Sequence, residues 1–235
     1  MIPTDTLGGT WEDTGPRADP RWNAYDRRSR TRAVSLLLRN EPRTGPALDL
    51  GCSIGAWWAF WRREGFPPPL GLDFAARHLA AARRRGFVPC CADGCRLPFR
   101  RNTLGVVLCI DVLVHLPDLW SRVALVEEVA RVLRPGGVAV FSVANVQGYR
   151  RGDWMHVEGS SVYLSENLCR GVFALAGLDV ERVRALQWVE SVRPWMRFTP
   201  RSLRYHVLMP LLDTLQRPAW RRHARLLFFK VRKPQ

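Results

Sequence analysis

Four aspartates in the first half of the chain each end or follow a short apolar run. They are Asp49, Asp73, Asp93 and Asp111. If the runs are parallel strands, their carboxyl ends meet at one edge of a sheet, where open α/β sheets bind ligands. Carboxylates at that edge accept hydrogen bonds from hydroxyl and amino groups or neutralise a cation. One such acid would be an ordinary solvated loop residue, but four in register predict a binding site.

A small-residue turn contains the first of these acids. The segment from Asp49 to Gly55 reads DLGCSIG and leads into an aromatic stretch. Glycine lets the backbone approach a ligand closely, and a helix N-terminus offers unpaired N–H groups. The turn therefore predicts a place for a polar, nucleotide-like ligand.

A histidine follows the fourth aspartate. His115 lies in the segment IDVLVHLPD, residues 110–118. Its ordinary pKa suits a general base that removes a proton from a hydroxyl or an amine. A structural histidine, hydrogen-bonded at the entrance of the next helix, is the alternative. The sequence leaves both roles open.

The elements that must position these residues alternate between strand and helix, which implies a mostly parallel α/β sheet with right-handed crossovers. Ser165 is expected to cap a helix, and Gly86 and Gly177 to end helices. Glu127 and Arg131 are expected to pair at i,i+4. We predict helices over about 21–39, 55–64, 75–85, 119–133 and 165–176, and strands over 47–50, 70–73, 87–92, 104–110, 138–143, 180–186 and 224–231.

Length and composition indicate one domain. With 235 residues, 47% of them hydrophobic, the chain can bury one sizeable core. We expect a flexible lead over 1–20 and a single domain over 21–235. No membrane-spanning apolar run or secretory leader is evident, so a cytoplasmic protein with reduced, mostly buried cysteines is expected. Cys90, Cys91 and Cys95 lack a second ligand pair nearby, so no zinc site is predicted.

The formal charge of +15 keeps a nucleic-acid partner open. Nearly all of this charge is arginine, in a chain also rich in Ala, Leu, Gly and Pro, as a GC-biased genome would produce. The cluster from Arg27 to Arg32 is read as a solvated helix face or as a nucleic-acid contact.

Three further segments carry a resemblance. Residues 71–74 read GLDF, residues 92–99 read ADGCRLPF and residues 133–137 read LRPGG. In this order, with the turn at Asp49, they resemble class I S-adenosylmethionine-dependent methyltransferases, in particular the small single-domain branch of ubiquinone and menaquinone biosynthesis. The resemblance covers about Tyr25 to Leu186. It implies a Rossmann-like, mostly parallel seven-stranded sheet with helices on both faces and an antiparallel C-terminal strand.

The resemblance also implies how the cofactor is held. Asp73 would bind both ribose hydroxyls, Phe74 would lie against the adenine, and Asp93 would accept from the adenine amino group. Asp111 would lie near the amino end of the cofactor. Ser53 replaces the middle glycine of the family's turn. The full expected set of cofactor-binding residues is Asp49, Gly51, Cys52, Ser53, Gly55, Asp73, Phe74, Asp93, Gly94, Ile110 and Asp111.

For the reaction, the resemblance implies direct methyl transfer that leaves S-adenosylhomocysteine, with His115 as the catalytic candidate. Some quinone-pathway relatives bind a divalent metal with an acid-x-x-Glu-His run. Val114 replaces that glutamate, so no metal is expected. The chain lacks the Asp/Asn-Pro-Pro-aromatic motif of enzymes that methylate amino groups of nucleic-acid bases. Transfer to O or N of a small molecule is therefore favoured.

The acceptor must be inferred from the segments that cover the site, expected at about 21–39, 144–164 and 187–223. Ten tryptophans suggest an aromatic or polycyclic acceptor. An RNA methyltransferase and a non-catalytic binder of the same cofactor are the rivals, and a monomer or homodimer is expected. The apolar stripe from Leu203 to Leu215 predicts packing on the domain or on a second subunit, or peripheral lipid contact. The expected substrate contacts are Tyr25, Trp154, His156, Trp188 and Trp195.

Overall fold

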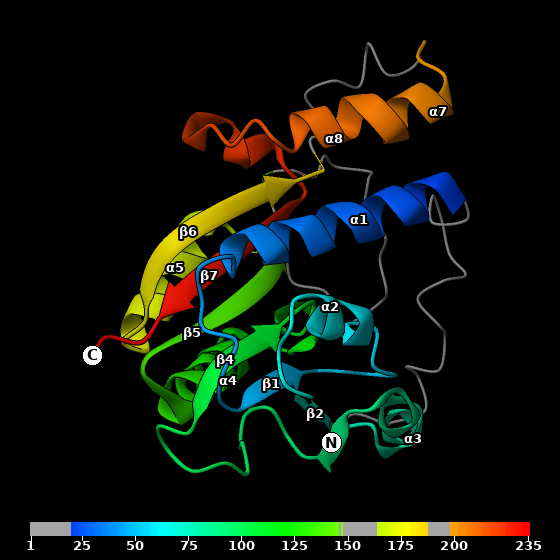
Figure 1. Ribbon diagram of the computed structural model, residues 1–235. Helices are drawn as coiled ribbons and strands as arrows, with labels where there is room; N and C mark the ends of the chain where they lie inside the picture. The colour runs from blue at the N-terminus through cyan, green and yellow to red at the C-terminus, as the bar shows by residue number, and fades with distance from the viewer. Residues whose placement is uncertain (1–19, 146, 148–163, 188–197) are drawn as a thin grey trace.

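The computed structural model describes residues 20–145, 147, 164–187 and 198–235, and its centre is a seven-stranded sheet. The order is β3-β2-β1-β4-β5-β7-β6, and β7 alone runs antiparallel to its neighbours (Figure 1). This confirms the predicted mostly parallel sheet with an antiparallel last strand. The strands are β1 (Ala47–Leu50), β2 (Leu70–Asp73), β3 (Val88–Cys91), β4 (Leu104–Cys109), β5 (Leu133–Ala144), β6 (Asp179–Leu186) and β7 (Leu226–Arg232).

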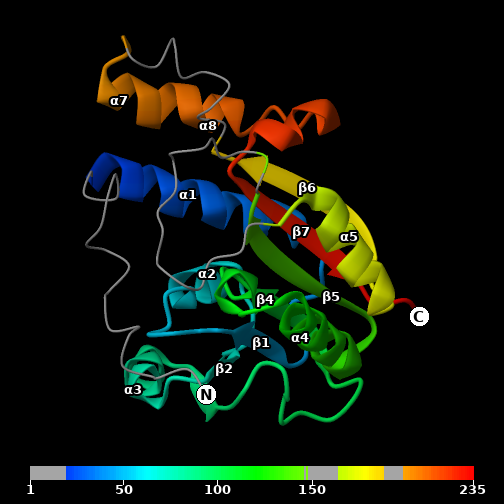
Figure 2. The ribbon, with the colours of Figure 1, turned by 180° about the vertical axis from the view of Figure 1, so that it is seen from behind.

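Helices cover both faces of the sheet (Figure 1, Figure 2). The longer ones are α1 (Pro20–Leu37), α2 (Trp58–Arg63), α3 (Ala76–Arg85), α4 (Leu119–Val132) and α5 (Glu166–Leu175). Helices α1, α2 and α3 share one apolar core with the sheet, and α4 and α5 share the other. The shorter helical pieces are η2 (Leu113–His115), α7 (Arg201–Leu203), η4 (Arg204–Leu208), α8 (Met209–Leu212) and η5 (Pro218–His223).

The period of two along a strand explains how both cores form. Leu48 and Leu50 of β1 face the core of α4, whereas Ala47 faces the core of α1 and α2. All six residues of β4 are buried, as expected for a central parallel strand covered on both faces.

Several helix ends have side-chain caps or glycines, and those at Ser165 and Gly86 were predicted. Asp118 accepts the N–H of Ser121 at the start of α4, and Ser165 accepts that of Leu168 at the start of α5. Gly86 ends α3 with a φ of 110°. Helix α2 is shorter than predicted because the chain from Gly55 is still in a turn until Trp58.

Two local predictions around the end of α4 were wrong. Strand β5 was predicted over 138–143, but it begins at Leu133 and includes the LRPGG segment, because Leu133 pairs with Leu104 before the ladder shifts register. A Cβ on Gly137 would lie 2.8 Å from the carbonyl oxygen of Arg134, so only glycine fits this bend. Arg131 pairs with Glu128 at 2.6 Å, whereas pairing with Glu127 was predicted.

The cysteines are all free thiols. Cys52, Cys109 and Cys169 are buried, whereas Cys91 is exposed at the end of β3. The expectation of mostly buried cysteines is therefore met only in part. Within the described ranges, no helix has both the length and the apolar character needed to cross a membrane.

Candidate functional site

The predicted site residues meet where the strand order reverses. Strand β1 pairs with β2 on one side and with β4 on the other, both in parallel. The chain leaves these three strands at Asp49 to Gly51, Asp73 and Asp111, all at the carboxyl edge of the sheet. Open α/β sheets bind ligands at this edge, which is called the crevice below.

The turn after β1 is fixed to the neighbouring strand. The N–H groups of Gly51 and Cys52 donate to the carbonyl oxygen of Leu72 at 2.8 and 3.0 Å. Gly51, Ser53 and Gly55 have φ values of 74°, 47° and 84°. All three family glycine positions are thus left-handed, which costs a serine more than a glycine. Gly51 and Gly55 therefore meet a backbone requirement, and Ser53 adopts the same left-handed conformation at a cost.

The packing of the chain also requires glycine at positions 51 and 55. A Cβ on Gly51 would lie 2.4 Å from a methyl group of Val112, in the loop after β4. A Cβ on Gly55 would lie 3.0 Å from the ring of Phe87. Sequence reasoning attributed both glycines to the approach of a ligand, which stays a prediction. The structure adds that side chains of this protein already occupy the space beside them.

Asp49 is a buried carboxylate, with an exposed fraction of 1%. Its Oδ2 accepts the indole N–H of Trp61 at 3.0 Å, which ties β1 to α2. Burial raises the pKa of Asp49 to about 7, although the bond from Trp61 opposes this and Asp73 adds to it. This role of Trp61 was not predicted, because a tryptophan that donates to a buried acid looks the same in sequence as any other core tryptophan.

Asp73 ends β2 and is held by backbone. Its two oxygens accept the N–H of Ser53 at 2.8 Å and that of Ala75 at 2.9 Å. The acid therefore links the turn after β1 to the start of α3. A carboxylate has about four acceptor positions, so it can still accept hydroxyl groups of a ligand.

The next predicted residues lie along the same edge. Phe74 is 61% exposed, so its ring is open to a ligand. Asp93 is exposed and accepts the N–H of Cys95 at 2.8 Å. Gly94 leaves room for Leu125, which a Cβ would approach to 3.1 Å. Ile110, by contrast, is buried in the core of α1 and α2.

Asp111 was expected to face a ligand's ammonium, and the structure gives it a protein cation as well. Arg30 of α1 donates to its Oδ2 at 2.5 Å, and Ser142 of β5 donates to its Oδ1 at 2.8 Å. Burial favours the neutral acid, but the charge of Arg30 and these bonds outweigh it and lower the pKa of Asp111. Arg30 also pairs with Asp26 at 2.8 Å.

Arg30 corrects the interpretation of the arginine cluster from Arg27 to Arg32. Its side chain is only 17% exposed and points to the end of β4, so it does not belong to a solvated face. The pKa of Arg30 is raised, because the attraction of Asp111 and Asp26 exceeds the effect of burial. Sequence spacing offered no signal for this role, because the other arginines of the cluster look the same in sequence.

His115 ends the short helix η2, next to the same crevice. Burial lowers its pKa, although Asp111 and Asp73 oppose the shift. Buried Arg122 of α4 steadies this loop by donating to the carbonyl oxygens of Leu113 and Leu116. Both roles of His115 remain predictions. Arg122, like Trp61 and Arg30, has a supporting role that was not predicted from the sequence.

Tyr25 belongs to α1 and is buried against Met209 of α8. Its hydroxyl donates to Asp213 at 2.8 Å, and burial with the Asp213 charge raises its pKa. The hydroxyl of Tyr25 is thus already hydrogen-bonded to Asp213. The contact of Tyr25 with substrate or cofactor stays a prediction. The other predicted substrate contacts, Trp154, His156, Trp188 and Trp195, lie outside the described residues.

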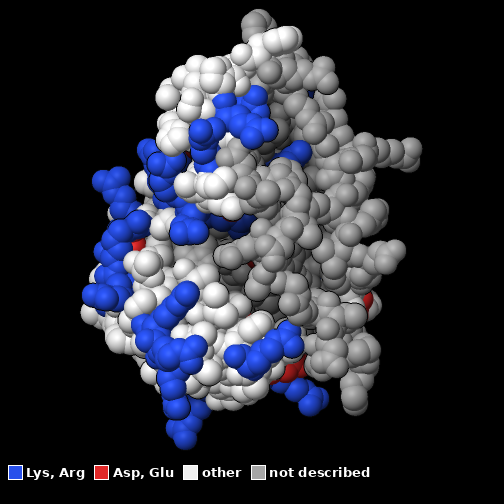
Figure 3. Space-filling model, turned by 90° about the vertical axis from the view of Figure 1, so that its right-hand side faces the viewer, with Lys and Arg blue, Asp and Glu red and all other residues white. Residues whose placement is uncertain are grey.

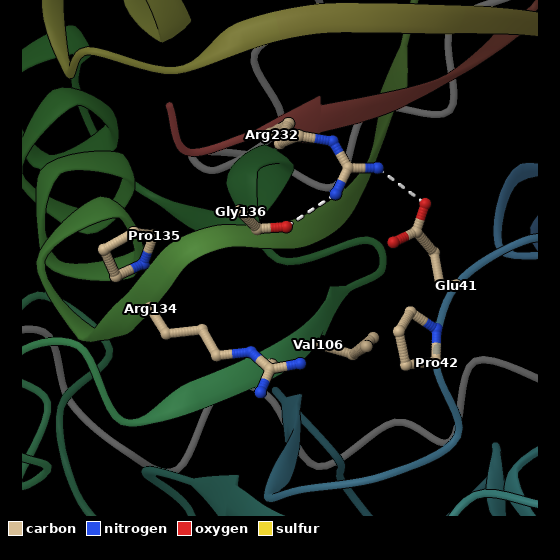
Figure 4. Close-up of a pocket in the computed structure, with 8 residues that line it drawn as sticks. Glu41, Pro42, Val106, Arg134, Pro135, Gly136 and Arg232 are labelled. Atoms are coloured by element: carbon tan, nitrogen blue, oxygen red, sulfur yellow. Dashed lines mark hydrogen bonds and ion pairs between the residues drawn. The ribbon is translucent and has the colours of Figure 1, made fainter. Parts of the chain in front are cut away.

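A cavity of about 230 Å³ lies elsewhere, at the amino ends of β4 and β5 (Figure 4). Glu41 and Arg134 lie on its wall, and Arg232 donates to Glu41 at 2.7 Å. This edge is opposite to the carboxyl ends that carry the four aspartates. Among the described residues, no group of His, Cys, Asp and Glu is arranged to hold a metal ion.

Comparison with known proteins agrees with this geometry. Residues 48–141 match the protein family described as "Methyltransferase domain". This range contains β1, β2, β3 and β4 and most of the crevice described above. This part of the chain is therefore similar to methyltransferase domains.

Relatives at the sequence level include tRNA methyltransferases and ubiquinone biosynthesis enzymes. A probable tRNA methyltransferase 9B of Bos taurus is 33% identical over 89 residues, which are 38% of this chain and 19% of the relative. A ubiquinone biosynthesis O-methyltransferase of Sodalis glossinidius is 32% identical over 155 residues, 61% of this chain and 57% of the relative. The chain thus spans about a fifth of one relative and just over half of the other.

Solved structures share the fold. A chain of the complex between the Haloferax volcanii Trm112 methyltransferase activator and a methyltransferase has a TM-score of 0.64 at 21% identity, covering 93% of this chain and 96% of that one. An S-adenosylmethionine-dependent methyltransferase from Mesorhizobium loti has a TM-score of 0.62 at 20% identity, covering 89% and 100%. The SpnF cyclase has a TM-score of 0.59 at 18% identity, covering 87% and 80%. These likenesses concern the fold.

Proposed function

We propose that the chain is an S-adenosylmethionine-dependent O- or N-methyltransferase that acts on a small aromatic or polycyclic acceptor. The observation that carries the proposal is the convergence of Asp73, Asp93 and Asp111 with the left-handed turn at Gly51 to Gly55, on a methyltransferase domain. When bound, S-adenosylmethionine supplies a methyl group on an electrophilic sulfonium.

The described residues fit this cofactor. Asp73 has acceptor positions left for two ribose hydroxyls, and the exposed ring of Phe74 offers an apolar surface to the adenine. The Arg30–Asp111 ion pair presents one cation and one anion at the end of β4. That pair is complementary to an amino acid zwitterion, whose carboxylate Arg30 would bind and whose ammonium Asp111 would bind.

The protein's contribution to transfer is orientation and proton removal. The turn and the two acids would align the methyl group with an attacking lone pair, and closure of the crevice would exclude water. His115 would take the proton of the acceptor's hydroxyl or amine. Its lowered pKa keeps the imidazole neutral at neutral pH, which is the form a base requires.

RNA is a second candidate acceptor, and two observations favour it. Relatives named as probable tRNA methyltransferases match the chain. In the described part of the face seen from the right of Figure 1, Figure 3 also shows many basic side chains and few acids. Exposed Arg83, Arg84 and Arg85 of α3 are part of the chain's basic surface.

The test is methyl transfer from labelled cofactor to two acceptor pools, one of small phenols and amines and one of bulk tRNA. We expect label in the first pool, with a rate that depends little on salt. Label in tRNA alone, with affinity that falls steeply as salt rises, would replace the small-molecule acceptor by RNA. Cofactor binding without transfer to either pool would favour a non-catalytic binder, since fold does not secure chemistry.

A further inference from the structure

The segment from α7 to α8 is apolar on two opposite sides. Its inner side packs on α1, where Met209 is fully buried against Tyr25, and Tyr205 stacks on Tyr25 with centroids 6.2 Å apart. A π-helical turn, η4, precedes Pro210. Proline lacks an N–H and clashes with the preceding turn, which accounts for the wider turn at this position.

The outer side carries what we call the outward stripe, Leu203, Val207, Leu211 and Leu215. These residues follow one another at intervals of four and are 43%, 51%, 59% and 39% exposed. Trp220 of the following helix η5 is 43% exposed as well. Leucine and valine side chains in such a row gain from a covering partner, because their apolar area is otherwise left in water.

The charged side chains of the segment that carries the stripe are nearly all basic. Residues 198–225 contain six arginines and a single acid, Asp213. Asp213 faces inward, where it accepts hydrogen bonds from Tyr25 and Ser29, and its exposed fraction is 7%. Arg221 pairs with Glu166 of α5 at 3.0 Å, whereas Arg217 and Arg222 are exposed, so the described part of this segment presents a basic surface.

This charge pattern discriminates between partners. In a two-fold dimer the same patch would face itself, so arginines would oppose arginines across an apolar contact. RNA would satisfy the arginines but would leave the aliphatic side chains without partners, because RNA is bound by stacking and phosphate contacts. A surface that is anionic outside and apolar beneath satisfies both features.

We propose that the outward stripe docks the protein on an anionic lipid surface, with Leu203, Val207, Leu211 and Leu215 entering the headgroup boundary and the flanking arginines contacting lipid phosphates. Helix α1 lies directly beneath and carries Arg30 of the candidate site. Docking would therefore hold the methyltransferase site next to the lipid surface, whatever acceptor it uses.

The experiment is sedimentation of the full chain with vesicles of phosphatidylcholine alone or with about 30% phosphatidylglycerol. We expect binding to the anionic vesicles only. The variant Val207→Ser with Leu211→Ser should lower the partition coefficient roughly tenfold or more, because two aliphatic side chains are lost from the boundary. Arg217→Gln should lower it about fivefold, the effect of one basic residue near a charged membrane.

Matched controls separate the stripe from general surface properties. Leu175→Ser removes a leucine that is 77% exposed on α5, and Arg84→Gln removes an exposed arginine of α3. Both should bind vesicles like the wild type, and circular dichroism should show that every variant is folded.

Three results would overturn the proposal. One is absence of binding to anionic vesicles, and another is equal binding by the wild type and the serine variant. The third is a dimer in sedimentation velocity that the serine variant abolishes, which would assign the stripe to a second copy. None of these readouts depends on methyl transfer, so failure here would leave the proposed function standing.

Discussion

Asp49→Asn should change how stability depends on pH. The carboxylate lies 1% exposed at the end of β1, with the indole N–H of Trp61 at 3.0 Å. Asparagine is nearly isosteric and can still accept from Trp61 through its Oδ1. The substitution therefore removes a titrating charge from the turn while it keeps the bond to α2.

The magnitude follows from the pKa. Burial raises the pKa of Asp49 to about 7 from an ordinary value of 3.8. Between these two values the folded chain holds a proton that the unfolded chain has released, so the free energy of unfolding falls as pH rises. A shift of this size corresponds to roughly 4 kcal/mol, at about 1.4 kcal/mol per pKa unit. This loss is complete above about pH 7.

The assay is urea unfolding, followed by tryptophan fluorescence, at intervals between about pH 5 and pH 8. The wild type should lose stability as pH rises. Asp49→Asn should lack the part of the loss due to this carboxylate and should be more stable than the wild type at pH 8 by a few kcal/mol. Burial also raises the pKa of Asp213 to about 6, so both proteins share that contribution.

The control is Asp179→Asn, an exposed aspartate at the start of β6. It should reproduce the wild-type profile. Parallel stability profiles for the wild type and Asp49→Asn would refute the reasoning, because they would mean that Asp49 is ionised in the folded chain over the whole range.

Three other predictions concern the crevice. Gly51→Ala should lower the free energy of unfolding, measured in urea, by about 2–4 kcal/mol, because the backbone is left-handed and the new Cβ would contact Val112. In a Val112→Ala background the substitution should cost less. A loss below about 1 kcal/mol in the wild-type background would contradict this. Arg30→Gln should raise the pKa of Asp111 and weaken cofactor binding about tenfold in calorimetry, and unchanged affinity would remove Arg30 from the site. His115→Gln should lower kcat about 100-fold or more with cofactor affinity unchanged. The wild-type rate should rise with pH through a midpoint below the ordinary histidine value of 6.5, because the pKa of His115 is lowered; near-normal turnover or a flat profile would make the histidine structural.

The sheet and its acids could be predicted because they depend on local pattern. Strands β1 and β2 have the predicted bounds, since a buried parallel strand is a short apolar run, here with an aspartate at its last or next-to-last position. The cap at Ser165 and the left-handed Gly86 were predictable for the same reason, because each depends on the backbone within a few residues.

What could not be predicted depends on partners far along the chain. Arg30 meets Asp111 from 81 residues away, and Tyr25 meets Asp213 from 188 residues away. Arg131 pairs with Glu128 and not with Glu127, because Glu128 is also held by the N–H of Leu97. Helical spacing does not encode that tertiary contact. A sequence gives the types of these side chains but leaves their facing partners undetermined.

Calorimetric binding of S-adenosylhomocysteine to the wild type, Asp73→Asn and Asp179→Asn is the most direct test of the central claim. We predict one site per chain in the wild type, affinity lower by about 1–3 kcal/mol in Asp73→Asn, and no change in the exposed control. The account would be contradicted if the wild type bound no cofactor, or if a folded Asp73→Asn variant bound it as tightly as the wild type does.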